Sequence, residues 1–186
     1  MTYQHCSNNE EDRNLGKYWE ERFCELAANV GKSFTAHQIG RSGSAVAWST
    51  KGGKPNADTL PDITVWTCPG EHHEVKHKAP TRHGGIGLEE YRLQSLVWFA
   101  KETGQSVQYT IHRHDLAGGR TGTANLPDHW FTIDVLKMEQ MRIDGDAYGP
   151  CPGKTYINGN LGYAPIWYWP ATSFVPLEEF WGIIAW

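Results

Sequence analysis

Hydrophobic residues recur at helical spacing in two segments of the chain. In residues 16–30 the apolar side chains follow one another at steps of three and four residues, and Gly31 comes directly after them. Residues 88–103 show the same period and are followed by Gly104. Glycine commonly ends a helix because it tolerates the left-handed backbone conformation found there. The pattern therefore predicts two amphipathic helices, over residues 16–30 and 88–103.

Several short segments between and after these helices have the composition of β-strands. They are residues 31–39, 63–66, 72–77, 106–112 and 129–136. Cys68-Pro69-Gly70-Glu71 is a turn signal between two of them, so residues 62–77 predict a β-hairpin. Residues 40–60 and 79–87 are rich in glycine and polar residues and predict loops. The order of helix, strands, helix and strand predicts an α/β fold, with a mixed central β-sheet flanked by helices.

Composition divides the chain into three parts. Residues 1–14 are polar and partly acidic, and we expect them to form a flexible leader. Residues 15–140 contain all the predicted helices and strands and form the expected core. Residues 141–186 are rich in Gly, Pro and aromatic residues. We expect this last part to be an extension that packs on the core or at a dimer interface.

The overall composition is that of an ordinary globular protein. The chain has 186 residues, of which 39% are hydrophobic and 20% charged. It contains no apolar run of membrane-spanning length, and its N-terminus lacks the basic start and apolar stretch of a secretory signal. The four cysteines form no CxxC pair, which favours reduced thiols. We therefore expect an intracellular protein.

The formal net charge of -4 weighs weakly against a nucleic-acid-binding protein, because phosphate neutralisation favours basic surfaces. The argument is weak because a metal-dependent nuclease needs acidic ligands, and bound cations reverse the local sign. The charge is also unevenly spread, since Lys76, Lys78, Arg82 and several histidines cluster near residues 72–83.

The pattern most informative about chemistry is Pro61-Asp62, followed after eleven residues by Glu74-Val75-Lys76. Side chains alternate along a strand, so Glu74 and Lys76 share one face. Asp62 begins the paired strand of the hairpin, and its carboxylate can approach that of Glu74. Two carboxylates and the backbone carbonyl of Val75 form an oxygen-rich site suited to Mg²⁺. Lys76 beside this site could hold or activate the attacking water and stabilise charge on a phosphoryl group.

An isolated ExK triplet more often marks a solvated strand face. The preceding Pro-Asp, the predicted hairpin and a helix on either side favour the catalytic interpretation here. With this context the sequence resembles the PD-(D/E)xK nuclease superfamily over roughly residues 15–140, and within it the archaeal-type Holliday junction resolvases. The elements that carry the resemblance are Gly16 with Glu20, Arg41-Ser42-Gly43-Ser44, Glu74-Val75-Lys76, Tyr91 with Gln94, and the strand Val107 to Ile111.

The resemblance implies a restriction-endonuclease-like core and a Mg²⁺-dependent DNA endonuclease, with Mn²⁺ as a substitute ion. It implies that Glu20 joins the metal site formed by Asp62, Glu74 and Val75. It also implies that Ser42 or Ser44 contacts the region of the scissile phosphate. A resolvase needs two active sites to cut two strands symmetrically, so a homodimer acting on branched DNA is expected.

Other side chains near the pattern are candidates for substrate contacts. Gln94 lies one turn before Trp98 on the second predicted helix and could orient the water or the phosphate. Arg41, Lys78 and Arg82 lie in or next to the loops that flank the predicted site, and they could pair with phosphates. Solvated surface charge is the competing interpretation for each of these three cations.

Three alternatives remain open from the residues alone. The first is a phage- or restriction-type nuclease that acts on duplex or single-stranded DNA. The second is a catalytically inactive DNA-binding module, which the intact set of Asp62, Glu74 and Lys76 disfavours. The third is a zinc-dependent protein that uses the histidines around residues 72–83 or 112–114. His72 shares the predicted face of Glu74 and could instead contact substrate.

Overall fold

The structure, a computed structural model, describes residues 10–37, 61–67, 70–120, 122, 124–157 and 160–183. Within this part of the chain, six strands form a central sheet in the order β1-β2-β3-β5-β6-β9. Their bounds are β1 Ser33–Ala36, β2 Ile63–Trp66, β3 Glu71–Lys78, β5 Ser106–Arg113, β6 Trp130–Asp134 and β9 Val175–Pro176. Strands β3 and β5 are parallel, whereas the other neighbours are antiparallel. The predicted α/β fold with a mixed central sheet is therefore confirmed.

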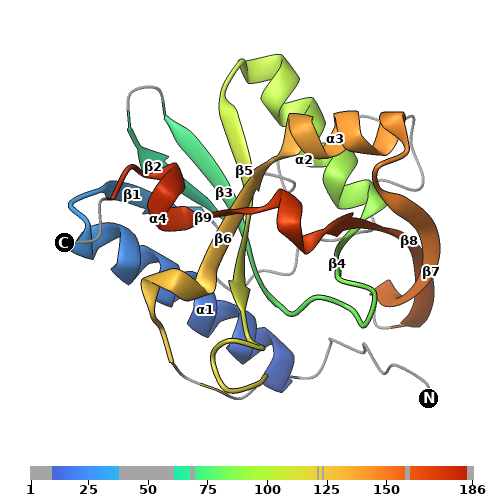
Figure 1. The fold of residues 1–186 in the computed structure, drawn as a ribbon, viewed down its shortest axis with the longest axis horizontal. Coiled ribbons are helices and arrows are strands. Elements are labelled where there is room, and N and C mark those ends of the chain that lie inside the picture. Colours follow the sequence, from blue (N-terminus) through green and yellow to red (C-terminus); the bar gives the residue numbers. More distant parts are fainter. Residues whose placement is uncertain are drawn as a thin grey trace.

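Helices cover both faces of this sheet. Their bounds are α1 Glu10–Asn29, α2 Glu90–Thr103, α3 Val135–Asp144 and α4 Leu177–Phe180, with short 3₁₀ turns at Pro127–His129 and Ala171–Ser173. In Figure 1, α2 and α3 lie side by side at the top and α1 runs along the bottom. One hydrophobic cluster joins α2 and α3 to β5, and a second joins α1 and α4 to β2 and β3.

The alternation of β3 assigns its side chains to these two faces. Val75 packs in the cluster that contains Trp19 and Phe23 of α1. His73 lies against Phe23, and His77 is stacked on Trp19. Glu74 and Lys76 therefore project from the opposite face, toward α2.

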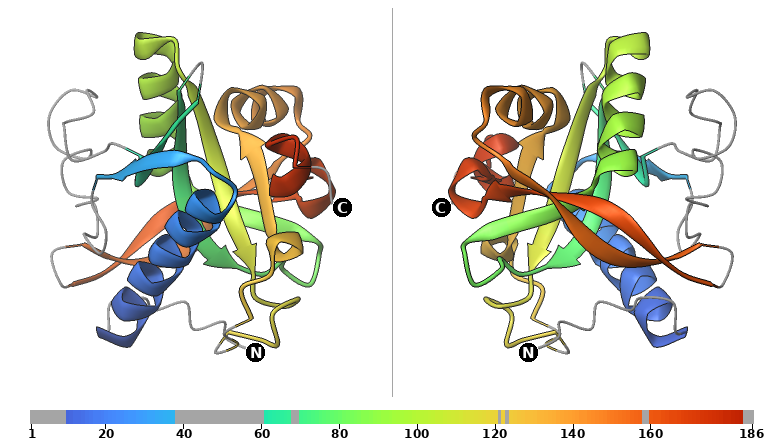
Figure 2. Two further views of the ribbon diagram at one scale, coloured as in Figure 1. Left: turned by 90° about the vertical axis from the view of Figure 1, so that its left-hand side faces the viewer. Right: turned by 90° about the vertical axis from the view of Figure 1, so that its right-hand side faces the viewer.

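A second sheet was not predicted. It joins β4 (Gly85–Glu89), β8 (Asn160–Pro170) and β7 (Tyr148–Ile157) in the order β4-β8-β7. Figure 2 shows the ribbon of β7 and β8 running diagonally across the molecule. The expected loop over residues 79–87 is therefore wrong from Gly85 onward. Its glycines have a packing reason, because a Cβ on Gly87 would lie 2.8 Å from Cε1 of Tyr168.

One helix begins earlier than predicted, and another was not predicted. Helix α1 begins at Glu10 rather than Gly16, and its first turns are polar, so no hydrophobic period marks them. Helix α3 follows β6 directly, where only a strand over residues 129–136 was expected. The side chain of Asp134 caps α3 by accepting hydrogen bonds from the backbone N–H groups of Leu136 and Lys137. No helix among the described residues is long and apolar enough to cross a membrane.

The aromatic C-terminal segment contributes to both hydrophobic clusters. Trp169 is fully buried in the first cluster beside Phe174, and its indole N–H donates to the carbonyl of Met138. Leu177 is fully buried in the second cluster. Of the large aromatic side chains that the structure describes between Trp167 and Trp181, none is exposed. Trp169 and Phe174 are buried and the others are half-buried, so these side chains form no exposed aromatic patch.

Replacing Trp169 with alanine should therefore destabilise the whole domain. Trp169→Ala should lower the free energy of unfolding by about 3–5 kcal/mol, because it removes a fully buried side chain from a packed core. Trp66→Ala is the matched control, since Trp66 is 60% exposed, and it should change stability by about 0.5 kcal/mol. Urea denaturation followed by circular dichroism measures both. Equal losses would contradict the placement of β8 in the core.

Candidate active site

The β2–β3 hairpin brings the predicted acidic residues together. Ile63 pairs with His73 in the antiparallel register, so Asp62, directly before β2, lies beside Glu74. The Oδ2 atom of Asp62 accepts a hydrogen bond from the backbone N–H of Val75, at 2.9 Å. Asp62 is 8% exposed and Glu74 1% exposed, so both carboxylates are buried. The predicted hairpin and the approach of the two carboxylates are both present.

Three oxygen atoms converge on the ammonium group of Lys76. Its Nζ lies 2.5 Å from Oε1 of Glu74, 3.1 Å from the carbonyl oxygen of Val75 and 3.4 Å from Oδ2 of Asp62. These are the three groups predicted to hold Mg²⁺. They already accept a cation at one point, and oxygen is the ligand atom that Mg²⁺ prefers, so the residues fit this ion. No set of three or more His, Cys, Asp or Glu side chains suited to a metal occurs among the described residues.

Arg92 completes this group of charges, and the sequence analysis missed it. Its Nη2 atom binds Oε2 of Glu74 and lies 4.0 Å from Oδ1 of Asp62. The Arg92 side chain is 13% exposed and comes from the first turns of α2. Its position between Tyr91 and Gln94 was the available signal, but a lone arginine on a helix is usually solvated. We call Asp62, Glu74, Lys76 and Arg92 the charged quartet.

The two acids of the charged quartet have different pKa values because their surroundings differ. Burial, together with the charge of Glu74, raises the pKa of Asp62 to about 6. Burial also acts to raise the pKa of Glu74, but the charges of Arg92 and Lys76 outweigh it and lower that pKa to about 2. Burial opposes the charged form of Lys76, yet Asp62 and Glu74 raise its pKa above the usual value. Lys76 therefore keeps its proton at neutral pH.

The two further residues predicted for catalysis, Gln94 and Glu20, come from two different helices. Gln94 is exposed on α2, and Arg92 is the residue of that helix that contacts the carboxylates. Glu20 is half-buried on α1, the helix that covers the other face of β3. The structure thus brings Asp62, Glu74, Val75 and Lys76 together, while the roles of Glu20 and Gln94 stay predictions.

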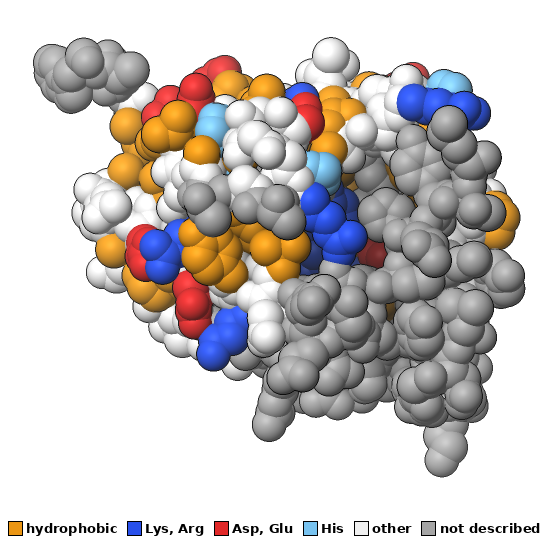
Figure 3. All heavy atoms as spheres, turned by 90° about the horizontal axis from the view of Figure 1, so that it is seen from below, with side chains coloured by type: hydrophobic (Ala, Val, Ile, Leu, Met, Phe, Trp, Pro, Cys, Tyr) orange, Lys and Arg blue, Asp and Glu red, His pale blue; other side chains and the backbone are white. Residues whose placement is uncertain are grey.

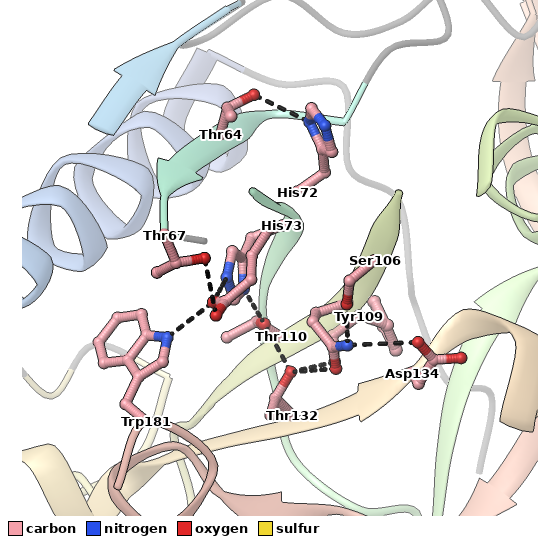
Figure 4. A network of polar contacts seen from close by, with 12 residues as sticks. Thr64, Thr67, His72, His73, Ser106, Tyr109, Thr110, Thr132, Asp134 and Trp181 are labelled. Carbon is pink, nitrogen blue, oxygen red and sulfur yellow. Dashed lines mark hydrogen bonds and ion pairs between the residues drawn. The ribbon is translucent and has the colours of Figure 1, made fainter. Parts of the chain in front are cut away.

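The histidines at the start of β3 have internal partners. His72 bonds through Nδ1 to Thr64 Oγ1 at 2.8 Å and through Nε2 to Gln105 Oε1 at 2.5 Å. His73 on the other face contacts Thr110 and Glu71 (Figure 4). Both rings are buried. His72 therefore serves in packing at the edge of α2, and its expected contact with substrate loses support.

The predicted phosphate contacts are only partly covered by the structure. Arg41, Ser42 and Ser44 lie outside the described residues. The Nζ of Lys78 donates to the carbonyl of Gly87 at 2.6 Å and so ties β3 to β4. Arg82 is exposed, with its Nε 2.9 Å from Nε2 of His83.

Positive charge nevertheless gathers on part of the surface. Figure 3 shows, on the face seen from below, Lys and Arg side chains beside a recessed acidic side chain. Acidic side chains lie elsewhere on the same face, so the charges of the chain are unevenly spread rather than uniformly negative.

Comparison with known proteins finds a similarity among solved structures. No protein-family model matches the chain, and no curated protein matches it. Among solved structures, the chain is similar to Hjc, a Holliday junction resolvase from the archaeal hyperthermophile Archaeoglobus fulgidus. The TM-score is 0.50 at 14% sequence identity, over 92% of this chain and 98% of that chain. At this identity the similarity shows a shared fold.

Removing Arg92 should expose how strongly the charged quartet depends on it. Arg92→Leu leaves the buried Glu74 with one cation fewer. It should lower the free energy of unfolding by about 3–5 kcal/mol at neutral pH. Arg142→Leu is the control, because it breaks an ion pair with Glu139 on α3. It should lower the free energy of unfolding by only about 0.5 kcal/mol. Urea denaturation at pH 7 and pH 3 tests both.

The pH dependence of this loss has a defined sign. The lowered pKa of Glu74 stabilises the fold above pH 4.5, and that contribution is lost as the pH falls toward about 2. The difference in the free energy of unfolding between wild type and Arg92→Leu should therefore decrease as the pH is lowered. A loss of stability in Arg92→Leu as small as that in Arg142→Leu would contradict the ion pair between Arg92 and Glu74. So would a loss that grows as the pH is lowered.

Proposed function

We propose that this protein is a Mg²⁺-dependent DNA endonuclease that cuts branched DNA, with Holliday junctions as its substrate and a homodimer as its working form. The observation that carries the proposal is the convergence of Asp62, Glu74 and the Val75 carbonyl on one cation, Lys76. The fold shared with a Holliday junction resolvase supports it.

The proposed metal site uses residues that are already oriented. Asp62, Glu74 and the carbonyl of Val75 would hold Mg²⁺, or Mn²⁺ in its place, and Glu20 is proposed as a further ligand. A bound Mg²⁺ supplies Lewis acidity to a phosphoryl oxygen and makes water a better nucleophile. The hydrogen bond from the Val75 N–H holds Asp62 in place, and Arg92 holds Glu74.

Lys76 is suited to stabilise negative charge rather than to remove a proton. Its raised pKa keeps the ammonium group protonated near neutral pH, so it is a poor general base. An ammonium group one-third exposed, next to the carboxylates, can still donate to water and to a phosphate oxygen. Its proposed role is to orient the attacking water and to stabilise the charge that develops on phosphorus-bound oxygens.

Residues around the charged quartet would contact the DNA. Ser42 or Ser44, with Arg41, is proposed to lie at the scissile phosphate, and Gln94 is proposed to orient the water or the phosphate. Arg82 is exposed and available for a phosphate contact. Lys78 could contribute only if it released the carbonyl of Gly87. The homodimer rests on the requirement for two symmetric cuts in a four-way junction.

Neutralising either carboxylate should abolish cleavage without abolishing DNA binding. Asp62→Asn and Glu74→Gln should each lower the single-turnover rate by two orders of magnitude or more, because each removes a charged ligand. Binding should be unchanged or tighter, since negative charge near phosphate is reduced. Asp128→Asn is the control, as Asp128 is 74% exposed and lies beside His129. Cleavage that survives EDTA, or wild-type rates in both variants, would contradict the proposal.

Substrate choice is tested separately from the chemistry. The protein should cut a four-way junction in preference to a linear duplex of equal length, and light scattering should give the mass of a dimer. Flap and single-stranded DNA complete the panel. A monomer that degrades duplex without preference would keep the nuclease chemistry but replace the resolvase with a phage- or restriction-type enzyme. DNA binding without cleavage in Mg²⁺ or Mn²⁺ would indicate an inactive binding module.

A further inference from the structure

Two tyrosine rings lie on the outer face of the second sheet. Tyr148 of β7 pairs with Tyr168 of β8, and their rings are stacked with centroids 4.9 Å apart at an interplanar angle of 11°. A Cβ on Gly87 of β4 would lie 2.8 Å from Cε1 of Tyr168, and one on Gly85 would lie 3.0 Å from Cε1 of Tyr148. Both rings therefore lie against the backbone of β4, on the face opposite its side chains in the first hydrophobic cluster. We call Tyr148 and Tyr168 the tyrosine pair.

A β-bulge sets the position of the outer ring. Between two successive paired positions, β7 has Gly149 and Pro150 where β8 has the single residue Trp167. Gly149 has a φ of 144°, and a Cβ there would lie 2.9 Å from the carbonyl oxygen of Ile166, so the bulge requires glycine. Bulges often re-aim a side chain next to a functional site. This one follows Tyr148 directly, and Tyr148 is 41% exposed.

The tyrosine pair is connected to the charged quartet through β3. Lys78 follows Lys76 by two residues on the same face of that strand, a separation of about 7 Å. The Nζ of Lys78 donates to the carbonyl oxygen of Gly87, the residue beneath the ring of Tyr168. The hydroxyl of the buried Tyr109 donates to the same oxygen at 3.0 Å. These two hydrogen bonds hold β4, and the tyrosine pair with it, beside the strand that carries Lys76.

Positive charge lies in the loop next to the tyrosine pair. The hydroxyl oxygens of Tyr148 and Thr81 are 3.4 Å apart, and Thr81 is followed by the exposed Arg82 and His83. By alternation Glu89 shares this face of β4, but it lies at the other end of the strand, next to α2. Proteins bind single-stranded nucleic acid with aromatic rings that stack on bases and cations that pair with the backbone. The combination of an exposed ring and an arginine therefore fits a nucleotide better than an apolar peptide.

We propose that the tyrosine pair is a stacking site for an unstacked nucleobase of the DNA strand bound at the charged quartet. The inference rests on the proposed function in one respect, which is that DNA is the ligand. A base inside a duplex is covered by its neighbours and reaches such a ring only at the cost of unstacking, whereas a base at a branch point or in a flap is already accessible. Every base has an aromatic face, so the site selects DNA structure rather than sequence. It therefore favours branched over fully paired DNA within each subunit.

Equilibrium binding in EDTA tests the site without cleavage. Fluorescence anisotropy compares a labelled four-way junction, a flap and a linear duplex. Tyr148→Ala should weaken binding of the flap by about five- to a hundredfold and leave duplex binding within about twofold of wild type, because one stacked base is lost. Tyr148→Phe keeps the ring and should bind as the wild type does. Trp66→Ala, which removes an exposed aromatic side chain from the central sheet, is the matched control and should change neither.

A fluorescent base gives a direct measure of stacking. The base analogue 2-aminopurine is placed in turn at each nucleotide next to the branch, and its emission is recorded as protein is added. At one of these positions the wild type and Tyr148→Phe should quench it. Tyr148→Leu keeps apolar bulk over Gly85 without an aromatic ring, so circular dichroism should show a folded protein that leaves the emission unquenched.

Cleavage in Mg²⁺ separates this inference from the proposed function. Tyr148→Ala should reach a maximal single-turnover rate within about twofold of wild type, but only at a higher protein concentration, because binding and not chemistry is impaired. Equal losses on flap and duplex, an equal loss in Trp66→Ala, or unquenched emission at every position would overturn the stacking site and leave the nuclease chemistry standing. Quenching by a protein that cuts no DNA would support the stacking site and overturn the proposed function alone.

Discussion

The ion pairing between the β2–β3 hairpin and the start of α2 is the interaction on which the rest of the site depends. Glu74 is almost completely buried, and an isolated buried carboxylate would be too costly to keep ionised. Arg92 reaches it from α2, and Lys76 reaches it from the same strand. The two cations offset the two acids, so the charged quartet has no net charge when all four groups are ionised. Helix α2 is thereby tied to the sheet at one defined place.

Strand β3 connects this polar site to the hydrophobic core through simple alternation. Glu74 and Lys76 face α2, while His73, Val75 and His77 face α1. The α1 face is closed by Trp19 and Phe23, and it fixes the strand from behind. A carboxylate on such a strand is held by the backbone rather than by a flexible loop, which is the condition for a preorganised site. The parallel partner β5 brings His112 beside His77 on the same closed face.

The sequence predicts the parts of this arrangement that depend on local pattern. Alternation placed Glu74 and Lys76 together, and the turn at residues 68–71 placed Asp62 beside them. Arg92 could not be found in this way, because its role depends on a partner eighteen residues earlier in the chain. Strand β4 was missed for a related reason: Gly85 and Gly87 indicate a loop until β8 pairs with them from far along the chain. Helix α3 is only ten residues long, and its start depends on the cap formed by Asp134.

The acidity of the chain is compatible with an anionic substrate once burial is considered. A carboxylate repels phosphate only to the extent that it is uncompensated, and the acids of the charged quartet are paired in a region of low dielectric. The negative charge of Asp62 is less well compensated than that of Glu74, in agreement with the raised pKa of Asp62. An additional cation would relieve that imbalance and leave the site with net positive charge. The neutral metal-free site thus gives phosphate no net attraction, whereas the metal-bound site would attract it, so under the proposed function metal and DNA should bind cooperatively.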